Sequence, residues 1–390
     1  MTAVESMPRF PFAPTILGEP PAEFAQLREG MRLRKVLLPT GDTAWLATRY
    51  ADVRQVLTDG RLSRAAATAE VAPRLGPMRP NPKSLMAMDP PDHTRLRRIL
   101  APMFSRAHSE QQRDRIVALV DELLSAMLAA GAPGELDAGL SRPLALTVIC
   151  DLLGVPDGDR RAFADWTDQA LTLRPDAGAD VGHARRALRD YLEALAAGGS
   201  HDGLMGTLTE SLAGEELTEV AATILTAGYH TVSTAITNSA LVLLRHPDQL
   251  AALRADRTRL PEAVEELLRY TPGPVSGGTI RVAVADLHIG DTLVRAGEAV
   301  IPATISANRD QTVFTAPDRL DLSRKPNGHI AFGAGVHHCL GMHLARVELS
   351  AAIAGLLDRF PGLALAAPPE RLAWRNGAMI GGLERLPIQW

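Results

Sequence analysis

Hydrophobic residues recur three or four positions apart over long stretches of this chain, as they do along one face of an α-helix. This spacing predicts long helices at residues 109–130, 143–153, 160–173, 182–197 and 218–245, and a shorter one at 50–57. Residues 220–244 are apolar almost all round, which is typical of a helix that crosses a large core. Short apolar runs at 45–48, 278–289 and 299–303 are typical of strands. The pattern predicts a mainly α protein with small β-sheets.

Two segments lack this periodicity. Residues 65–88 contain four prolines, and a loop of that length inside a compact chain is commonly functional. Residues 307–328 are rich in proline, asparagine and aspartate, and they lead into a glycine-containing loop. Because no internal repeat or low-complexity linker divides the sequence, we expect a single domain over residues 1–390.

Composition narrows the class of protein. The chain has 390 residues, of which 46% are hydrophobic, so it can bury a large core. Its net charge is only −4 with both signs mixed along the chain, which argues against a nucleic-acid partner or a polybasic membrane surface. No basic start followed by a long apolar run precedes residue 20, so we expect neither a signal peptide nor a membrane anchor.

The strongest chemical signal is residues 332–341, which read Phe-Gly-Ala-Gly-Val-His-His-Cys-Leu-Gly. Gly333 and Gly335 allow backbone conformations that other residues resist, and the pattern of 340–349 predicts a helix directly after Cys339. A helix N-terminus lowers the pKa of a nearby thiol, so Cys339 is suited to bind a metal ion as thiolate. The plainer alternative is a buried structural cysteine in a glycine-rich turn.

The other cysteine, Cys150, lies in an apolar run and is expected to be a core residue. A disulfide between the two cysteines would remove the proposed ligand, so a reducing cytoplasm fits best.

These ten residues resemble the Phe-Gly-x-Gly-x-His-x-Cys-x-Gly signature of the cytochrome P450 superfamily, soluble bacterial type, and match all of its fixed positions. The resemblance implies the P450 fold, with haem b (iron protoporphyrin IX) between a long central helix and the cysteine loop. Cys339 would be the axial iron ligand, and Phe332 and Gly341 would belong to the same cofactor-binding loop.

Further positions match the family's contacts to the haem propionates. They are His93 and Arg97, four residues apart after two prolines, together with Arg281 and His337. Taken singly, each of these residues is equally consistent with a surface cation.

A third match to the family concerns residues that would stabilise the fold and would not bind the haem. Glu266 and Arg269 fit the family's Glu-x-x-Arg motif, in which the spacing of three places both side chains on one helix face. Arg319 matches the arginine that joins that pair, which predicts a buried acid shared by two guanidinium groups. Without the cysteine loop, a solvated helical ion pair would be the simpler interpretation of the motif.

Residues 227–231, Ala-Gly-Tyr-His-Thr, resemble the family's Ala-Gly-x-(Asp/Glu)-Thr, with Gly228 for local opening of the helix and Thr231 as the hydroxyl at the oxygen site. His230 replaces the acid, and three interpretations of it stay open. In the first, His230 relays protons in ordinary oxygenation. In the second, it marks a site that abstracts hydrogen without inserting oxygen. In the third, its side chain points away from the oxygen site and satisfies neighbouring groups.

Positions that line the substrate pocket can be nominated only by correspondence with the family. They are mostly small and apolar, which favours an apolar or aromatic ligand: Asn81, Met86, Met88, Val275, Ser276 and Met379.

The resemblance implies an oxidoreductase that activates O2 with electrons from a ferredoxin and an NAD(P)H-dependent ferredoxin reductase. We expect a monomer that monooxygenates a small specialised metabolite, with a ferredoxin docking near Arg98, Arg106 and Arg346. The alternatives are oxidative C–C or C–N coupling, a haem-binding sensor or carrier without turnover, and oxygenation driven by peroxide.

Overall fold

The structure is a computed structural model, and it describes residues 7–13, 19–30, 32–76, 79–171, 178–198, 203–271, 279–375 and 380–390. Its α-helices are α1 Ala22–Glu29, α2 Tyr50–Thr58, α3 Asp92–Leu100, α4 Arg106–Gln111, α5 Arg113–Ala130, α6 Arg142–Leu153, α7 Arg160–Ala170, α8 Gly178–Ala197, α9 Gly203–Ser211, α10 Gly214–Leu244, α11 Pro247–Ala255, α12 Leu260–Tyr270, α13 Thr304–Ala307 and α14 Met342–Arg359. Its strands are β1 Leu33–Leu37, β2 Thr43–Ala47, β3 Leu62–Ser63, β4 Gly134–Glu135, β5 Arg281–Ala283, β6 Leu287–Ile289, β7 Thr292–Val294, β8 Ala299–Pro302, β9 Ala364–Leu365 and β10 Pro387–Gln389. The prediction of a mainly α protein with small sheets is confirmed.

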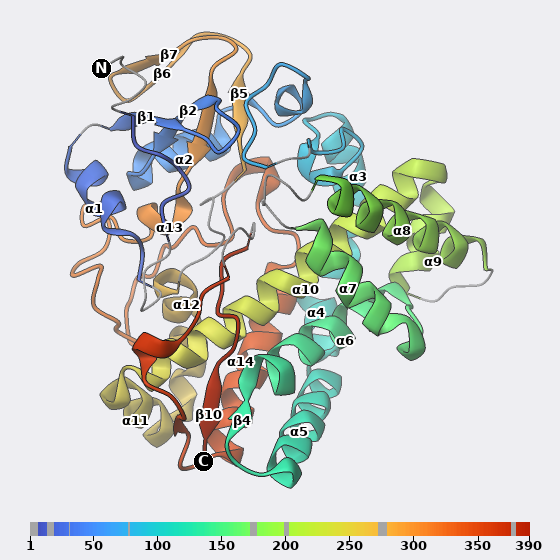
Figure 1. Ribbon diagram of the computed structural model, residues 1–390, viewed down its shortest axis with the longest axis vertical. Helices are drawn as coiled ribbons and strands as arrows, with labels where there is room; N and C mark the ends of the chain where they lie inside the picture. Colours follow the sequence, from blue (N-terminus) through green and yellow to red (C-terminus); the bar gives the residue numbers. More distant parts are fainter. Residues whose placement is uncertain are drawn as a thin grey trace.

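The 31-residue helix α10 forms the centre of the molecule (Figure 1). It packs against α6, α8 and α14, and α14 packs in turn against α5. Most of its side chains are buried, as the apolar sequence of residues 220–244 predicted, and they belong to the largest hydrophobic cluster. A helix covered on nearly every side provides a rigid support for the few polar groups that it carries.

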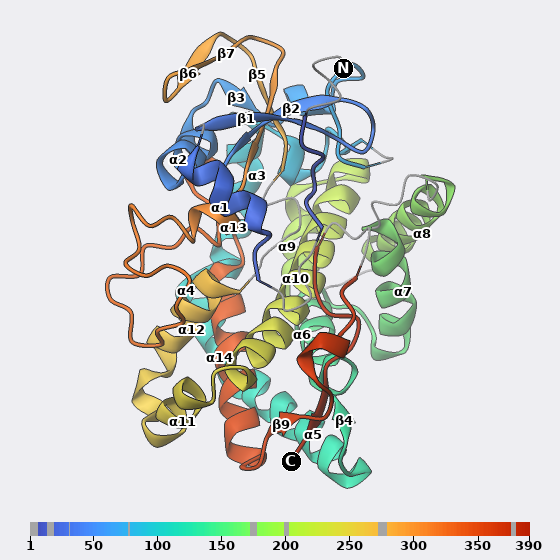
Figure 2. The same cartoon turned by 60° about the vertical axis from the view of Figure 1, so that its left-hand side comes forward.

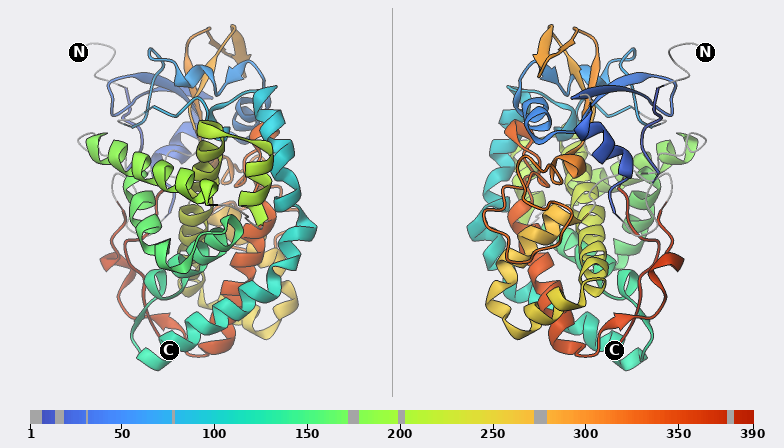
Figure 3. Two further views of the ribbon diagram at one scale, coloured as in Figure 1. Left: turned by 90° about the vertical axis from the view of Figure 1, so that its right-hand side faces the viewer. Right: turned by 90° about the vertical axis from the view of Figure 1, so that its left-hand side faces the viewer.

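The strands lie mainly at one end of the molecule, and the two side views show α5, α11 and the C-terminus at the other (Figure 3). The largest sheet has the order β1-β2-β8-β5-β3, in which β2 and β8 are parallel and the other pairs antiparallel. This order joins the first 63 residues to residues 281–302, and Figure 2 shows the sheet above α2 and α3. Arg281 is therefore held at a fixed position, buried on β5.

Several element boundaries differ from the sequence-based expectation. The helix expected at 109–130 is two helices, α4 and α5, which meet at Gln112. It also begins earlier than expected, at Arg106, because Ser105 caps the first turn of α4 by accepting from the main-chain N–H of His108. The strand expected at 278–289 is divided between β5 in the large sheet and β6, which forms a hairpin with β7. None of the helices in the described ranges has the length and apolar character that crossing a bilayer requires.

Candidate active site

Cys339 lies at the end of a loop that is folded against the C-terminal end of α2. Its main-chain N–H donates to the carbonyl of Phe332 at 2.9 Å, and α14 begins three residues later at Met342. Gly335 has φ of +73°, and a Cβ there would lie 2.5 Å from the main-chain oxygen of Leu57. Only glycine combines this conformation with this close approach, so Gly335 fixes how the loop presents the cysteine.

Burial raises the pKa of the Cys339 thiol. The amide of Gly341 and the guanidinium groups of Arg97 and Arg346 oppose this rise and do not overcome it. The predicted effect of the helix N-terminus is present in the Gly341 amide, but burial outweighs it. A coordinating metal ion deprotonates a thiol outright, so this site suits a metal ligand better than a free nucleophile.

Four predicted cofactor contacts come together next to this loop. The imidazole rings of His93 and His337 have centroids 4.2 Å apart, and Arg97, one turn after His93 on α3, donates to the main chain of the loop at His338. Burial, together with the nearby positive charges of His93, Arg281 and Arg97, lowers the pKa of His337 to about 3. One carboxylate, Asp89, acts on His93 and Arg281, but the basic side chains outnumber it, and such a cluster favours an anionic ligand.

The structure adds one residue, Arg64, to this group of basic side chains, and the sequence did not reveal it. Arg64, directly after β3, is buried, and it donates to the main-chain oxygens of Met86 at 2.7 Å and Ile280 at 3.0 Å. Burial and the charge of Arg281 lower its pKa to about 9, and Arg64 in turn lowers the pKa of His337. No local pattern around residue 64 marks it, because its acceptors lie 22 and 216 residues away in the sequence.

The central helix has an accessible strip in its middle, among mostly buried residues. Ala227 and Thr231, one turn apart, are exposed, and the Thr231 hydroxyl donates to the carbonyl of Ala227 at 2.6 Å. The helix is continuous here, and a Cβ at Gly228 would lie 2.7 Å from Cδ1 of Ile149 on α6. Gly228 therefore has a packing role that the sequence did not suggest, while its role in opening the helix for dioxygen stays a prediction.

His230 is buried and faces α7 instead of sharing the accessible strip. Its Nε2 lies 3.2 Å from Oδ1 of Asp168, although the contact does not have hydrogen-bond geometry, and its ring packs on Tyr229. Arg142 of α6 binds the other oxygen of Asp168 and lies over the Tyr229 ring. Burial lowers the pKa of His230 to about 4 against the opposing charge of Asp168, so the imidazole is neutral at neutral pH. These contacts agree with the interpretation that His230 points toward its neighbours.

The Glu-x-x-Arg prediction is confirmed for two residues and wrong for the third. The Glu266 and Arg269 side chains are fully buried and form a two-point ion pair with both contacts at 2.8 Å. The second guanidinium comes from Arg324, not Arg319, because the loop turns the Arg319 carbonyl inward as an acceptor and leaves its side chain exposed.

The nominated substrate-pocket residues are only partly described. Val275, Ser276 and Met379 lie outside the described residues. Asn81 bonds Lys83 and Glu215, Met86 is exposed, and Met88 packs on the core, so they give no evidence of a common pocket.

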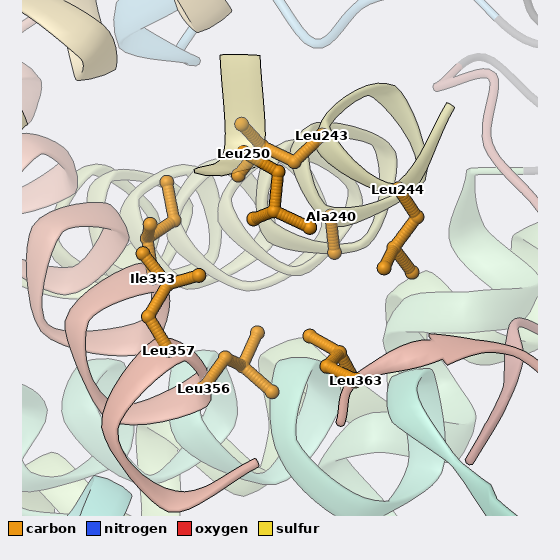
Figure 4. Close-up of a pocket in the computed structure, with 8 residues that line it drawn as sticks. All are labelled: Ala240, Leu243, Leu244, Leu250, Ile353, Leu356, Leu357 and Leu363. Carbon is orange, nitrogen blue, oxygen red and sulfur yellow. The ribbon is translucent and has the colours of Figure 1, made fainter. Parts of the chain in front are cut away.

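A small apolar hollow with room for about 10 Å³ lies elsewhere. It is at the far end of α10, between α10, α11 and α14, and aliphatic side chains line it (Figure 4): Ala240, Leu243, Leu244, Leu250, Ile353, Leu356, Leu357 and Leu363. It holds none of the polar groups described above, so we assign it to packing.

The residues of the site fit a haem. Nδ1 of His93 and Nε2 of His337 are buried without a hydrogen-bond partner beside Arg64, Arg97 and Arg281, as two carboxylates of a buried macrocycle would require. Cys339 supplies a sulfur ligand, and α10 supplies an accessible strip with one hydroxyl. This combination defines a haem-thiolate protein.

Comparison with known proteins agrees with that class. The family model for cytochrome P450 matches residues 183–370. Nocardicin C N-oxygenase of Nocardia uniformis subsp. tsuyamanensis is 42% identical over 98% of each chain. The crystal structure of HinD with NMFT and NO has a TM-score of 0.94 with 44% identity, covering 99% of this chain and 100% of that one. The structure of cytochrome P450mel 107F1, described as having biaryl coupling reactivity, has a TM-score of 0.92 with 35% identity over 98% of each chain. This chain belongs to the cytochrome P450 superfamily, and it is an oxidoreductase that uses haem b with Cys339 as the axial ligand.

Proposed function

We propose that this protein is a monooxygenase that inserts one atom of O2 into a small, apolar specialised metabolite. The observation that carries the proposal is the Thr231 hydroxyl, held on the accessible strip in the middle of a central helix that is otherwise largely buried. The similarity to nocardicin C N-oxygenase, an enzyme named for oxygen insertion, supports the same class of reaction here.

When bound, the haem supplies the activation of O2. The chain would supply the surroundings. Cys339 would bind the iron as thiolate, Arg97 and Arg281 would pair with the propionates, and His93 and His337 would hydrogen-bond them, with Arg64 beside them. The Thr231 hydroxyl is directed to the Ala227 carbonyl, and rotation about its Cα–Cβ bond would let it donate a proton on the accessible side of α10.

The electrons come, in this proposal, from a ferredoxin and its NAD(P)H-dependent reductase, and the protein works as a cytoplasmic monomer. Arg98 of α3 and Arg106 of α4 are exposed cations on helices next to the cysteine loop, and small ferredoxins are acidic. Arg346, which we also expected in the docking surface, is paired at two points with Glu265, so it offers less free charge.

The test is to incubate the reconstituted enzyme with small-molecule extract of its host under ¹⁸O2 and to follow products by high-resolution mass spectrometry. A new product that carries one heavy oxygen supports monooxygenation and reveals the substrate. A haem sensor or carrier would leave every mass unchanged, which would contradict the proposal. Labelled product with hydrogen peroxide but none with ferredoxin would instead support peroxide-driven oxygenation.

Oxidative coupling is the second candidate, and two observations favour it. His230 replaces the acid of the family motif, and a relative with biaryl coupling reactivity is 35% identical over nearly the whole chain. Coupling predicts a product that has lost two hydrogens, or two joined units, without label from ¹⁸O2.

A further inference from the structure

We propose that Glu265 of α12 is a positioning residue that tunes the reduction potential of the haem through Arg346 of α14. The two carboxylate oxygens of Glu265 accept from Nε and Nη2 of Arg346 at 2.6 and 2.8 Å, so the guanidinium is held at two points. Arg346 lies one turn into α14, the helix that begins three residues after the cysteine ligand. Glu265 therefore determines how much of the positive charge of Arg346 acts on that ligand.

His329 fixes the same carboxylate from a second direction. It is buried, and its Nε2 lies 3.1 Å from an oxygen of Glu265. Its Nδ1 accepts from the main-chain N–H of Ala331 at 3.2 Å, so the ring proton is on Nε2 and is donated to Glu265. The imidazole is therefore neutral and adds no charge to the pair. Burial raises the pKa of Glu265, but the hydrogen bonds from Arg346 and His329 outweigh it and lower that pKa to about 2, so the carboxylate is charged at neutral pH.

Contiguous contacts join this group to the cysteine. The Arg346 guanidinium lies 4.7 Å from the centre of the Phe332 ring, and the His329 ring lies beside the same ring with centroids 6.1 Å apart. The Phe332 carbonyl in turn accepts from the main-chain N–H of Cys339. Burial raises the pKa of the Cys339 thiol, and the charge of Arg346 is among those that oppose the rise.

The same charge has a consequence for the bound haem. A cation that favours a thiolate over a thiol also favours the site after it has gained an electron, because both changes add negative charge. Arg346 without its partner would therefore raise the reduction potential, and Glu265 keeps it lower by compensating the guanidinium.

A purely structural role is the competing explanation. Glu266, the next residue on α12, binds Arg324, and adjacent helical residues point about 100° apart. The two carboxylates thereby hold two points of the segment that leads to the cysteine, at residues 324 and 329. An anchor affects stability, whereas a compensating charge affects the reduction potential with a defined sign, so the two explanations can be separated.

The test measures the reduction potential of each substrate-free holoenzyme by spectroelectrochemical titration. E265Q leaves Arg346 uncompensated, so we expect the one-electron equilibrium to shift about tenfold toward the reduced form, a rise of about 59 mV. R346Q removes the cation and leaves the carboxylate, so the potential should fall by a similar amount. The double variant E265Q/R346Q should return close to the wild-type value. The control is E262Q, on the same helix, whose carboxylate pairs with the exposed Lys325 and whose loss should leave the potential unchanged.

Opposite shifts in E265Q and R346Q support the proposal, and shifts of the same sign or wild-type potentials in both would overturn it. R346K retains the charge without the two-point pairing, so it should keep a potential close to the wild type. A potential as low as that of R346Q would show that packing on Phe332 sets the value, against the proposal. Urea unfolding accompanies each titration, and lower stability of E265Q with an unchanged potential would leave Glu265 as an anchor only.

These measurements need neither substrate nor turnover. Failure of the ¹⁸O2 experiment with opposite potential shifts intact would overturn monooxygenation but not the role of Glu265. Unchanged potentials with labelled product would do the reverse.

Discussion

Arg324 donates its Nε to both carboxylate oxygens of Glu266, at 3.1 and 3.0 Å, so that a fully buried acid is held between two guanidinium groups. The second guanidinium is that of Arg269, which also donates to the carbonyls of Asn308 and Pro317. The Glu266 carboxylate thereby fixes the loop of residues 308–324 on α12. This loop leads directly to the cysteine ligand, so its anchorage contributes to the geometry of the haem site.

The variant R324A should be strongly destabilising. It leaves Glu266 with one guanidinium fewer in a water-free environment, and breaking a buried ion pair costs on the order of 3 kcal/mol. R319A removes an exposed side chain and should change stability by less than about 0.5 kcal/mol. Urea unfolding of both variants measures the difference. A larger loss in R319A than in R324A would show that Arg319 is the partner after all.

The variant C339S should abolish the red-shifted absorption band that the ferrous carbon-monoxide complex owes to a thiolate ligand. The matched control is C150S, which alters the only other cysteine of the chain. Cys150 is buried, and burial raises the pKa of its thiol to about 12, so it stays protonated and inert. Retention of the band in C339S would mean that another side chain ligates the iron.

The sequence predicted what local spacing determines and missed what distant contacts decide. The glycine loop, Cys339 and the long α10 are encoded in consecutive residues, and they are where the sequence placed them. The choice between Arg319 and Arg324 depends on the course of an irregular loop, which has no periodicity to indicate which side chain turns inward. Arg64 could not be recognised, because its acceptors at residues 86 and 280 come together only in the folded chain.

The orientation of His230 lies between these two cases, because local spacing predicts part of it and distant contacts decide the rest. Adjacent residues of an α-helix point about 100° apart, so a histidine next to Thr231 could not share its direction. Helical geometry therefore allowed the prediction that His230 faces another helix. That this helix brings a carboxylate, Asp168, was not encoded in any local pattern.

The variant R64M tests whether the additional buried arginine helps to hold the cofactor. Arg64 is one of the charges gathered around His337, so its loss should speed transfer of haem to apomyoglobin by about tenfold. R61M removes an arginine that is exposed and paired with Asp59, and it should transfer haem at the wild-type rate. If R64M lowers stability in urea but leaves the transfer rate unchanged, Arg64 supports only the main chain at residues 86 and 280.

The docking surface predicts a charge-dependent rate of reduction. R98E/R106E replaces two exposed cations, so it should slow reduction by a plant-type ferredoxin by about tenfold at low salt and by less at high salt. Stopped-flow absorbance under carbon monoxide measures the rate, and reduction by dithionite serves as the control. R371E, at an exposed site far along the sequence, should reduce normally. Wild-type rates in the double variant would place the partner elsewhere.

His230 should make the protein sensitive to mild acid. Its folded pKa of about 4 lies below the ordinary value of 6.5, because burial opposes the charged imidazole more than Asp168 favours it. Between these two values the unfolded chain binds more protons than the folded one, so the free energy of unfolding decreases as the pH falls. The contribution is fully present above the unfolded pKa and is lost progressively down to the folded one.

The variant H230Q should remove this part of the acid response. Wild-type protein should lose at most about 3 kcal/mol of stability from His230 between about pH 7 and pH 4, and H230Q should lose correspondingly less. Urea unfolding across this range measures the difference, with H183Q as control because His183 is exposed on α8. If H230Q and the wild type have parallel pH profiles, His230 titrates normally and its burial against Asp168 does not hold it neutral.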